Sequence, residues 1–417
     1  MSGNNEAPAE LTLIGRHYAS GEPVEVGISG EKIAYVRERN NEGEESPGKE
    51  GRTSFGAGAD DGVDDSLSFI GPGLVDLQIN GYRGRDFNLP PLRPGLTDET
   101  TRLLYGEGVT GYCPTVITNR PESIEQAMRA IARDCREGRD AARSVAGIHL
   151  EGPFLSPEDG ARGAHSAADI RAPDWELFRR WQDAAEGRIR ILTMSPEWPN
   201  SADFIERCSD SGVIVSIGHT AASSEQIADA AAAGARLSTH LGNGAHLQLP
   251  RHPNYIWEQL AQDGLSSCVI ADGFHLPDQV LKVVLKVKAD KALLVSDAVA
   301  LSGMPPGRYE TAVGGQVTLT PEGKLHLADN ERLLAGSAQM LSRGIERLFS
   351  RGLASFADAW EMASVRPAAL LGLEAAAGLT PGAPADIAVF RRAETGRLTA
   401  EATCVRGELA YHRAERE

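Results

Sequence analysis

Eight short apolar runs, separated by stretches with helical periodicity, occupy the middle of this chain. They cover residues 73–80, 111–118, 146–151, 189–195, 212–219, 235–241, 267–272 and 292–297. Most are almost continuously apolar, as is typical of strands buried on both faces of a parallel sheet. Strand and helix alternating eight times predict an α/β fold, a (β/α)8 TIM-type barrel. An open doubly wound sheet is the alternative, but the glycine fingerprint expected after its first strand is missing.

The stretches between and after these runs predict the remaining elements. Helices are expected at residues 97–106, 121–136, 174–184, 201–211, 223–233, 255–262 and 277–288. Beyond the eighth run, residues 308–327 predict hairpin strands, and residues 331–351 and 356–371 predict two helices.

Both ends of the chain have strand character. Residues 11–37 alternate between apolar and polar side chains around a turn at 29–32, and residues 386–391 and 402–411 return to this pattern. Neither end can bury a face alone, so we expect them to form one small β-sandwich. The predicted domains are therefore 1–70 and 376–417 as two parts of the sandwich, and 71–375 as the barrel.

One segment of the N-terminal part has a different composition. Residues 40–66 hold six glycines and eight acidic residues against two basic ones, which predicts a flexible acidic insertion at the surface.

Charge and composition exclude several classes of function. The 417 residues carry a formal net charge of −16 and no dense basic cluster, so we expect no nucleic-acid partner. No window approaches 18 consecutive apolar residues, and the N-terminus has no signal-peptide pattern, so no membrane partner is expected. The five cysteines are scattered and form no CxxC pair, which favours reduced thiols and a cytoplasmic location.

Polar residues stand where the barrel strands should end. Glu151 closes the third run, His219 closes the fifth, and His240 stands at the end of the sixth. In a barrel the carboxyl ends of the strands build the active site, so these three side chains should meet. Two imidazoles and a carboxylate suit one divalent metal ion with an open fourth position. Zinc is the expected ion, although iron, manganese or cobalt accept the same ligands.

A second carboxylate, Asp297, closes the eighth run. Across from a metal it can take a proton from water and deliver it to a leaving group. His149 lies two residues before Glu151, on the same side of the strand, and is predicted to orient Glu151.

Six segments, in this order, resemble the motifs of a known group of enzymes. They are GPGLVDLQINGYRGRDFN (71–88), HLEGPFL (149–155), GHT (218–220), STHLGNG (238–244), IADGFH (270–275) and VSDA (295–298). GLTPGAPADIAVF (378–390) resembles the C-terminal sandwich signature of the same group. On these segments the chain resembles the amidohydrolase superfamily and, within it, the N-acetylglucosamine-6-phosphate deacetylases.

The resemblance implies metal-dependent removal of an acetyl group from N-acetylglucosamine 6-phosphate. Most superfamily members carry His-x-His on the first strand to hold a second metal, whereas this chain has Gln78-x-Asn80. The resemblance therefore favours a single metal held by Glu151, His219 and His240, with Gln78 and Asn80 beside it. By the same resemblance, Asp297 is the general base and acid.

The resemblance also implies the residues that contact the substrate. His165 matches a histidine at the acetamide group, and His275 matches one on the sugar side. Asn243 and the backbone of Gly244 fall where the family binds phosphate. Arg251 falls near an arginine that reaches the phosphate of a neighbouring subunit, which implies a homodimer.

The loop after His240 departs from the family pattern. Glycines stand at 242 and 244, and the segment LPRHPNYIWEQLA (249–261) is unusual. An amidohydrolase acting on a different, unphosphorylated N-acyl amino sugar or N-acyl amine is therefore an alternative. A catalytically silent sugar-phosphate-binding protein is disfavoured, because every expected metal ligand and the acid/base residue are present.

Overall fold

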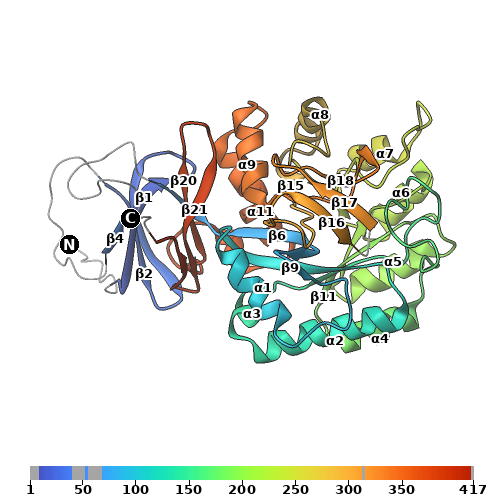
Figure 1. The fold of residues 1–417 in the computed structure, drawn as a ribbon, viewed down its shortest axis with the longest axis horizontal. Helices are drawn as coiled ribbons and strands as arrows, with labels where there is room; N and C mark the ends of the chain where they lie inside the picture. Colours follow the sequence, from blue (N-terminus) through green and yellow to red (C-terminus); the bar gives the residue numbers. More distant parts are fainter. Residues whose placement is uncertain (1–8, 40–51, 55–67, 312–314, 415–417) are drawn as a thin grey trace. The chain divides into compact units, whose positions relative to one another are not determined.

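The computed structural model describes residues 9–39, 52–54, 68–311 and 315–414 (Figure 1). The chain divides into two compact units. One combines the residues up to Val75 with Thr101–Gly111 and everything from Leu341 onward, and the other comprises Asp76–Thr100 and Tyr112–Met340.

Eight parallel strands follow one another in chain order and form a barrel, as predicted. They are β6 (Leu74–Ile79), β9 (Val109–Ile117), β10 (Ile148–Glu151), β11 (Ile189–Met194), β12 (Ile214–Ile217), β13 (Leu237–Ser238), β14 (Ser266–Val269) and β15 (Ala292–Leu294). Each overlaps one of the eight apolar runs, although β9 begins two residues before its run and β14 begins one residue before its run. A parallel bridge between Ile79 and Ala298 joins the end of the first strand to the segment after the last.

A buried carboxylate reinforces this closure. Asp76 Oδ1 accepts hydrogen bonds from the backbone N–H of Gln78 and of Ser296, each at 3.2 Å, and the Ser296 hydroxyl donates to the Gln78 carbonyl. Desolvation raises the pKa of Asp76 to about 7. The closure places the polar end of β6 beside the residue that follows Ser296, which is Asp297.

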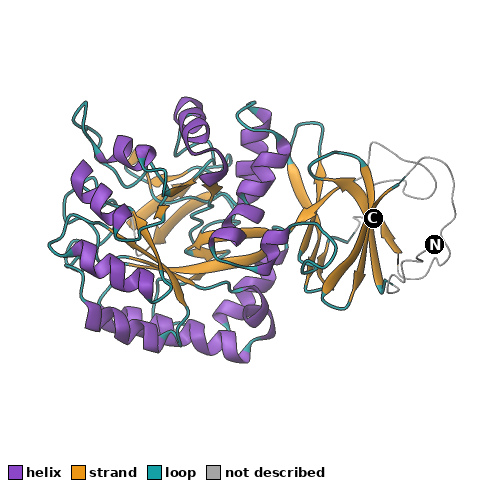
Figure 2. Ribbon diagram, turned by 180° about the vertical axis from the view of Figure 1, so that it is seen from behind, coloured by secondary structure: helices purple, strands orange, loops and turns teal. Residues whose placement is uncertain are grey.

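Helices surround these strands, as Figure 2 shows. They are α1 (Leu96–Tyr105), α2 (Pro121–Glu137), α3 (Arg139–Ser144), α4 (Trp175–Ala184), α5 (Ser201–Asp210), α6 (Ser224–Ala232), α7 (Tyr255–Ala261) and α8 (Asp278–Lys288), followed by the 3-10 turn η1 (Ala289–Lys291). Side-chain caps explain several starts: Asp174 caps α4, Ser223 and Gln226 form a capping box on α6, and Asn254 caps α7. Helix α3 was not predicted; Asp98 accepts from its first backbone N–H groups.

A small antiparallel sheet follows the barrel strands. Its strands are β16 (Gly307–Thr311), β17 (Gly315–Leu319), β18 (Leu325–Leu327) and β19 (Asn330–Leu334), in that order across the sheet. Val317, Leu319 and Leu325 pack with Leu301 beneath it. The two-stranded ribbon β7 (Gly81–Tyr82) and β8 (Arg85–Asp86) lies in the loop after β6.

Two helix predictions in this region need correction. The helix expected at 331–351 begins only at Leu341 (α9, Leu341–Ser350), because residues 330–334 pair with β18 as strand β19. The helix expected at 356–371 is two helices, α10 (Phe356–Met362) and α11 (Val365–Leu370), separated at Ser364, whose backbone is not helical and whose hydroxyl donates to the Trp360 carbonyl.

The other unit contains a sheet built from both chain ends, as predicted. Its order is β22 (Glu408–His412), β21 (Leu398–Val405), β20 (Ile387–Arg392), β5 (Phe69–Pro72), β1 (Leu11–His17), β2 (Pro23–Ser29) and β3 (Lys32–Glu38), and β4 (Arg52–Ser54) also pairs with β1. The antiparallel pairing of β20 with β5 joins the two ends of the chain. The turn η2 (Glu374–Ala377) and helices α9–α11 belong to the same unit.

Two further sequence predictions concern the acidic segment and membrane-spanning helices. The acidic segment at 40–66 lies outside the described residues except for β4. None of the helices in the described ranges combines the length and the apolar character that crossing a membrane requires.

Candidate active site

Three side chains from three barrel strands converge at the carboxyl ends of the strands. Glu151 is the last residue of β10, and His219 and His240 each follow a strand by two residues. Glu151 Oε1 lies 3.1 Å from His240 Nε2 and 3.4 Å from His219 Nε2. The two Nε2 atoms are 3.1 Å apart. All three side chains are buried.

These atoms fit the ligand shell of one divalent ion. His219 Nδ1 donates a hydrogen bond of 3.0 Å to the Ala161 carbonyl, so Nε2 is the ring nitrogen whose lone pair is available to a metal ion. That lone pair faces another imidazole nitrogen and a carboxylate oxygen. Ligand atoms at about 2.0–2.2 Å from a tetrahedral ion lie about 3.3–3.5 Å apart. The separations between Glu151 Oε1, His219 Nε2 and His240 Nε2 are close to these ligand–ligand distances. A cation between the three atoms explains why a lone pair and a carboxylate oxygen, which are both acceptors, face one another.

The charge state of Glu151 agrees with a role as a metal ligand. Burial alone would raise the pKa of Glu151, but its interactions with His219 and His240 outweigh the burial and hold the pKa well below the usual range. The side-chain amide of Gln78 donates a further hydrogen bond of 3.1 Å to Glu151 Oε1. Glu151 is therefore an ionised carboxylate held in place from three directions.

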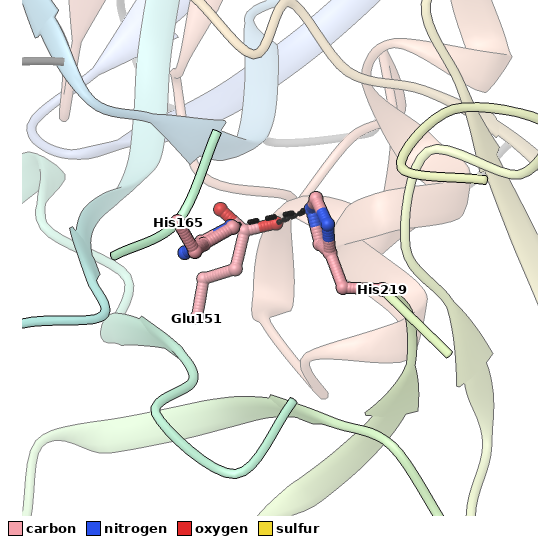
Figure 3. Close-up of side chains that lie close together, drawn as sticks. All are labelled: Glu151, His165 and His219. Carbon is pink, nitrogen blue, oxygen red and sulfur yellow. Dashed lines mark hydrogen bonds and ion pairs between the residues drawn. The ribbon is translucent and has the colours of Figure 1, made fainter. Parts of the chain in front are cut away.

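His165 joins this group from a loop. It is buried, and its Nε2 lies 3.3 Å from His219 Nε2. One ligand atom each of Glu151, His165 and His219 lie within 4.8 Å of one another, and Figure 3 shows the three side chains together. Burial, followed by the neighbouring His219, lowers the pKa of His165 to about 3, so its ring is neutral.

Two glycines pack against the Nδ1–Cε1 edge of the His219 ring. Gly163 and Gly244 have φ values of +59° and +57°. A Cβ on Gly244 would lie 2.5 Å from His219 Nδ1 and Cε1, and one on Gly163 would lie 3.1 Å from Cε1. Gly244, which sequence reasoning placed at a phosphate, therefore also packs directly against a candidate metal ligand.

Asp297 faces the same site from the end of the eighth strand. Asn80 Nδ2 donates a 2.7 Å hydrogen bond to Asp297 Oδ1. Burial raises the pKa of Asp297 to about 6, and the Asn80 hydrogen bond opposes that rise. His219, His240 and Asp297 all have positive φ, at +48°, +25° and +49°, a strained backbone that is concentrated at functional sites.

Sequence reasoning missed Asn88. Its amide nitrogen donates to the Thr115 carbonyl at 3.1 Å and makes a long contact of 3.5 Å with Asn80 Oδ1, while its own oxygen accepts from Ile117 N–H at 2.8 Å. This arrangement fixes which end of the Asn80 amide points at Asp297. The Asp-Phe-Asn sequence at 86–88 was the feature of the sequence that could have pointed to Asn88.

Glu197 also had no predicted role. Its carboxylate accepts hydrogen bonds from the hydroxyls of Ser156 (2.9 Å) and Ser195 (2.6 Å) and from the backbone N–H of Ala221 (2.8 Å). Ser156 N–H in turn donates to the carbonyl of His219 at 2.9 Å. Glu197 therefore ties the loop after His219 to the two preceding strand ends.

The other candidate residues lie as follows. His149 bonds to the Leu77 carbonyl and to Thr193 Oγ1, not to Glu151 as expected. His275 Nδ1 lies 2.7 Å from Asp272 Oδ2, and the Asn243 amide donates to the His240 carbonyl. Arg251 is exposed and forms no ion pair with any residue that the structure describes. Their predicted substrate contacts stay predictions.

Comparison with known proteins explains this constellation. The profile of the Amidohydrolase family matches residues 69–403, which include every strand-end residue above. The chain belongs to the amidohydrolase family. This amidohydrolase is 32% identical to the N-acetylglucosamine-6-phosphate deacetylase of Bacillus subtilis, over 82% of this chain and 85% of that protein. It is also 32% identical to the human protein of the same name, over 85% and 86% of the two chains.

A solved structure supports the same relationship. The N-acetyl-D-glucosamine-6-phosphate deacetylase from Mycobacterium smegmatis, a mutant in complex with N-acetyl-D-glucosamine-6-phosphate, matches with a TM-score of 0.81 and 25% identity, covering 96% of this chain and 99% of that one. The expected resemblance, fold class and enzyme class are thereby confirmed for this amidohydrolase.

Proposed function

We propose that this amidohydrolase removes the acetyl group from N-acetylglucosamine 6-phosphate and releases glucosamine 6-phosphate and acetate. The observation that carries the proposal is the convergence of Glu151, His219, His240 and Asp297 at the carboxyl ends of four barrel strands. Relatives that span most of the chain are named for this activity. They favour it over the alternative of an unphosphorylated N-acyl substrate.

The cofactor we propose is one divalent ion, zinc, held by Glu151, His219 and His240. Two imidazoles and one carboxylate leave a fourth position open, which is the arrangement of catalytic zinc sites; iron, manganese and cobalt accept the same donors. When bound, the ion polarises the amide carbonyl and lowers the pKa of a water molecule.

Asp297 moves the proton in the reaction we propose. Its ionised carboxylate takes one proton from water as the water oxygen adds to the carbonyl carbon. It returns this proton to the sugar nitrogen as the C–N bond breaks, so one water is consumed and Asp297 recovers its charge. The hydrogen bond from Asn80 orients the carboxylate for both transfers. His165 lies where it can stabilise the negative charge that develops on the carbonyl oxygen.

Substrate contacts follow from the loops around the site. Asn243, the backbone of Gly244 and His275 lie on the segments that follow β13 and β14, and we assign them to the sugar phosphate. Arg251 is exposed and suits a phosphate that lies in a neighbouring subunit.

A homodimer in the cytoplasm completes the proposal. Three valines on one face of α8, Val280, Val283 and Val287, are exposed, as is Trp257 on α7. Apolar stripes of this kind mark protein–protein contacts. All five cysteines are free and buried, as is usual in a reducing compartment.

The experiment that tests the function compares two substrates. Acetate release by the zinc-loaded protein is measured with N-acetylglucosamine 6-phosphate and, side by side, with N-acetylglucosamine. A strong preference for the phosphorylated sugar is expected. Equal rates would favour the alternative substrate class, and acetate release from neither would contradict the proposal.

A further inference from the structure

The loop after β13 contains a histidine that no step of the proposed reaction uses. His246 stands in the part of the chain that departs from the family pattern, two residues after Gly244. Its side chain is only 25% exposed, whereas Leu247, the next residue, is 94% exposed. His246 is therefore held by contacts within the protein, and its neighbour is not.

Tyr255, the first residue of α7, binds His246 at two atoms. The backbone N–H of His246 donates to the Tyr255 hydroxyl at 2.8 Å, and His246 Nδ1 lies 3.0 Å from the same oxygen. Tyr255 is itself buried, and Asn254 fixes the start of its helix by accepting from two backbone N–H groups of the first turn. Burial raises the pKa of Tyr255, so the hydroxyl keeps its proton and can donate it to Nδ1.

The other nitrogen of the ring meets the loop that carries His165. His246 Nε2 lies 3.2 Å from Glu158 Oε2. An ionised carboxylate only accepts hydrogen bonds, so Nε2 carries the ring proton and Nδ1 is left to accept from the Tyr255 hydroxyl. Each polar atom of the His246 ring thus has a complementary partner, one on α7 and one on the loop of His165.

The two loops also pack directly against each other. A Cβ on Gly160 would lie 3.1 Å from His246 Cα, and a Cβ on Gly163 would lie 3.9 Å from Gly244 Cα. The loop of His165 therefore touches the segment after β13 in two places, at His246 and at one of the residues that we assign to the sugar phosphate.

We propose that His246 is a positioning residue that holds the phosphate-binding segment, Asn243 and Gly244, against the loop of His165. The inference rests on the proposed function and deepens it, because it names what keeps the sugar-phosphate contacts in place. A segment that is already ordered loses less conformational freedom when a ligand binds. Without the contacts of His246 the phosphorylated substrate should bind more weakly, while the proton transfers at Asp297 should continue.

The test compares two substrates in three zinc-loaded proteins, the wild type, His246→Ala and Tyr255→Phe. Tyr255→Phe removes only the hydroxyl. In both variants the KM for N-acetylglucosamine 6-phosphate should rise about 10-fold, as expected for the loss of one or two hydrogen bonds, with kcat within about 2-fold of the wild type. The kcat/KM for N-acetylglucosamine should stay the same. The preference for the phosphorylated sugar should therefore fall about 10-fold, and because both substrates are measured on one sample, this ratio does not depend on the fraction of active enzyme.

Three further variants test the partners of the ring. Glu158→Ala removes the acceptor of Nε2–H, whereas Glu158→Gln keeps an oxygen that can accept from it. Glu158→Ala should therefore lower the preference for the phosphorylated sugar more than Glu158→Gln does. Leu247→Ala is the matched control in the same loop, because Leu247 is almost fully exposed, and it should keep the preference of the wild type.

The outcomes separate this inference from the proposed function. An unchanged preference in both His246→Ala and Tyr255→Phe would overturn the role of His246 and leave the deacetylase activity standing. An equal loss with both substrates would also overturn it, because it would show a general structural effect and no link to the phosphate. A wild-type protein that does not prefer the phosphorylated sugar would instead contradict the proposed function, whatever the variants do.

Discussion

The side-chain amide of Asn80 donates a 2.7 Å hydrogen bond to the carboxylate of Asp297, joining the ends of the first and eighth barrel strands. Because Asn80 can donate to the carboxylate, it favours the ionised form of Asp297 against the effect of burial. The bond therefore links the closure of the barrel to the protonation state that the proposed reaction requires.

Replacing Asn80 with leucine should shift the pH dependence of the enzyme. Loss of the donor raises the pKa of Asp297, so the base is protonated at higher pH and the rate falls earlier as the pH is lowered. A hydrogen bond to a charged group contributes about 1.5–3 kcal/mol, which corresponds to about one to two pH units on the acidic limb of kcat/KM. Gln78→Leu is the control, because Gln78 contacts Glu151, not Asp297. An acidic limb that stays in place in Asn80→Leu contradicts the role given to Asn80.

Asp297→Asn should separate metal binding from catalysis. The variant keeps Glu151, His219 and His240, so its zinc content should equal that of the wild type. It cannot take a proton, so kcat should fall by about 10³-fold or more. Metal analysis and acetate release on the same sample measure both quantities, and near wild-type turnover would remove Asp297 from the mechanism.

Gly244→Ala should weaken metal binding through His219. The added Cβ would lie 2.5 Å from the ring at a φ of +57°, so the ring or the loop must move. Gly212→Ala is a matched control: its φ is +82°, but nothing lies within 4 Å of the added Cβ. Both variants should lose about 1–2 kcal/mol of unfolding free energy from the backbone conformation. Only Gly244→Ala should also lose zinc affinity, and equal affinities in the two variants would refute the contact.

Glu197→Gln should loosen the loop that carries His219. The amide presents a donor where two hydroxyls and a backbone N–H already donate, so at least one hydrogen bond is lost at a cost of about 1–3 kcal/mol. We expect zinc affinity to fall about 10-fold, in the range for residues that support metal ligands. Glu176→Gln, on the exposed first turn of α4, should change neither quantity. If Glu197→Gln binds zinc as tightly as the wild type does, the hydrogen bonds of Glu197 have no effect on the metal site.

The barrel and the convergence of its polar strand ends were accessible from the sequence for one physical reason. Strands buried on both faces must be continuously apolar, so Glu151, His219 and Asp297 stand out where each run ends. Parallel strands then bring these ends to the same rim, whatever lies between them in the chain.

Contacts made between loops were not accessible in this way. Glu197 holds Ser156 and Ala221, and Asn88 reaches Asn80 and Thr115, through hydrogen bonds that depend on loop conformation. Strand β19 was predicted as helix because Glu331, Arg332 and Leu333 favour helices locally, but pairing with β18 outweighs that preference.

In the reaction we propose, hydrolysis requires a divalent ion at Glu151, His219 and His240. The most direct test is acetate release from N-acetylglucosamine 6-phosphate by chelator-stripped protein as zinc is added back. We expect no acetate without metal and a rate that rises to its maximum at one equivalent of zinc per chain. Full activity in protein shown to contain no metal would contradict it.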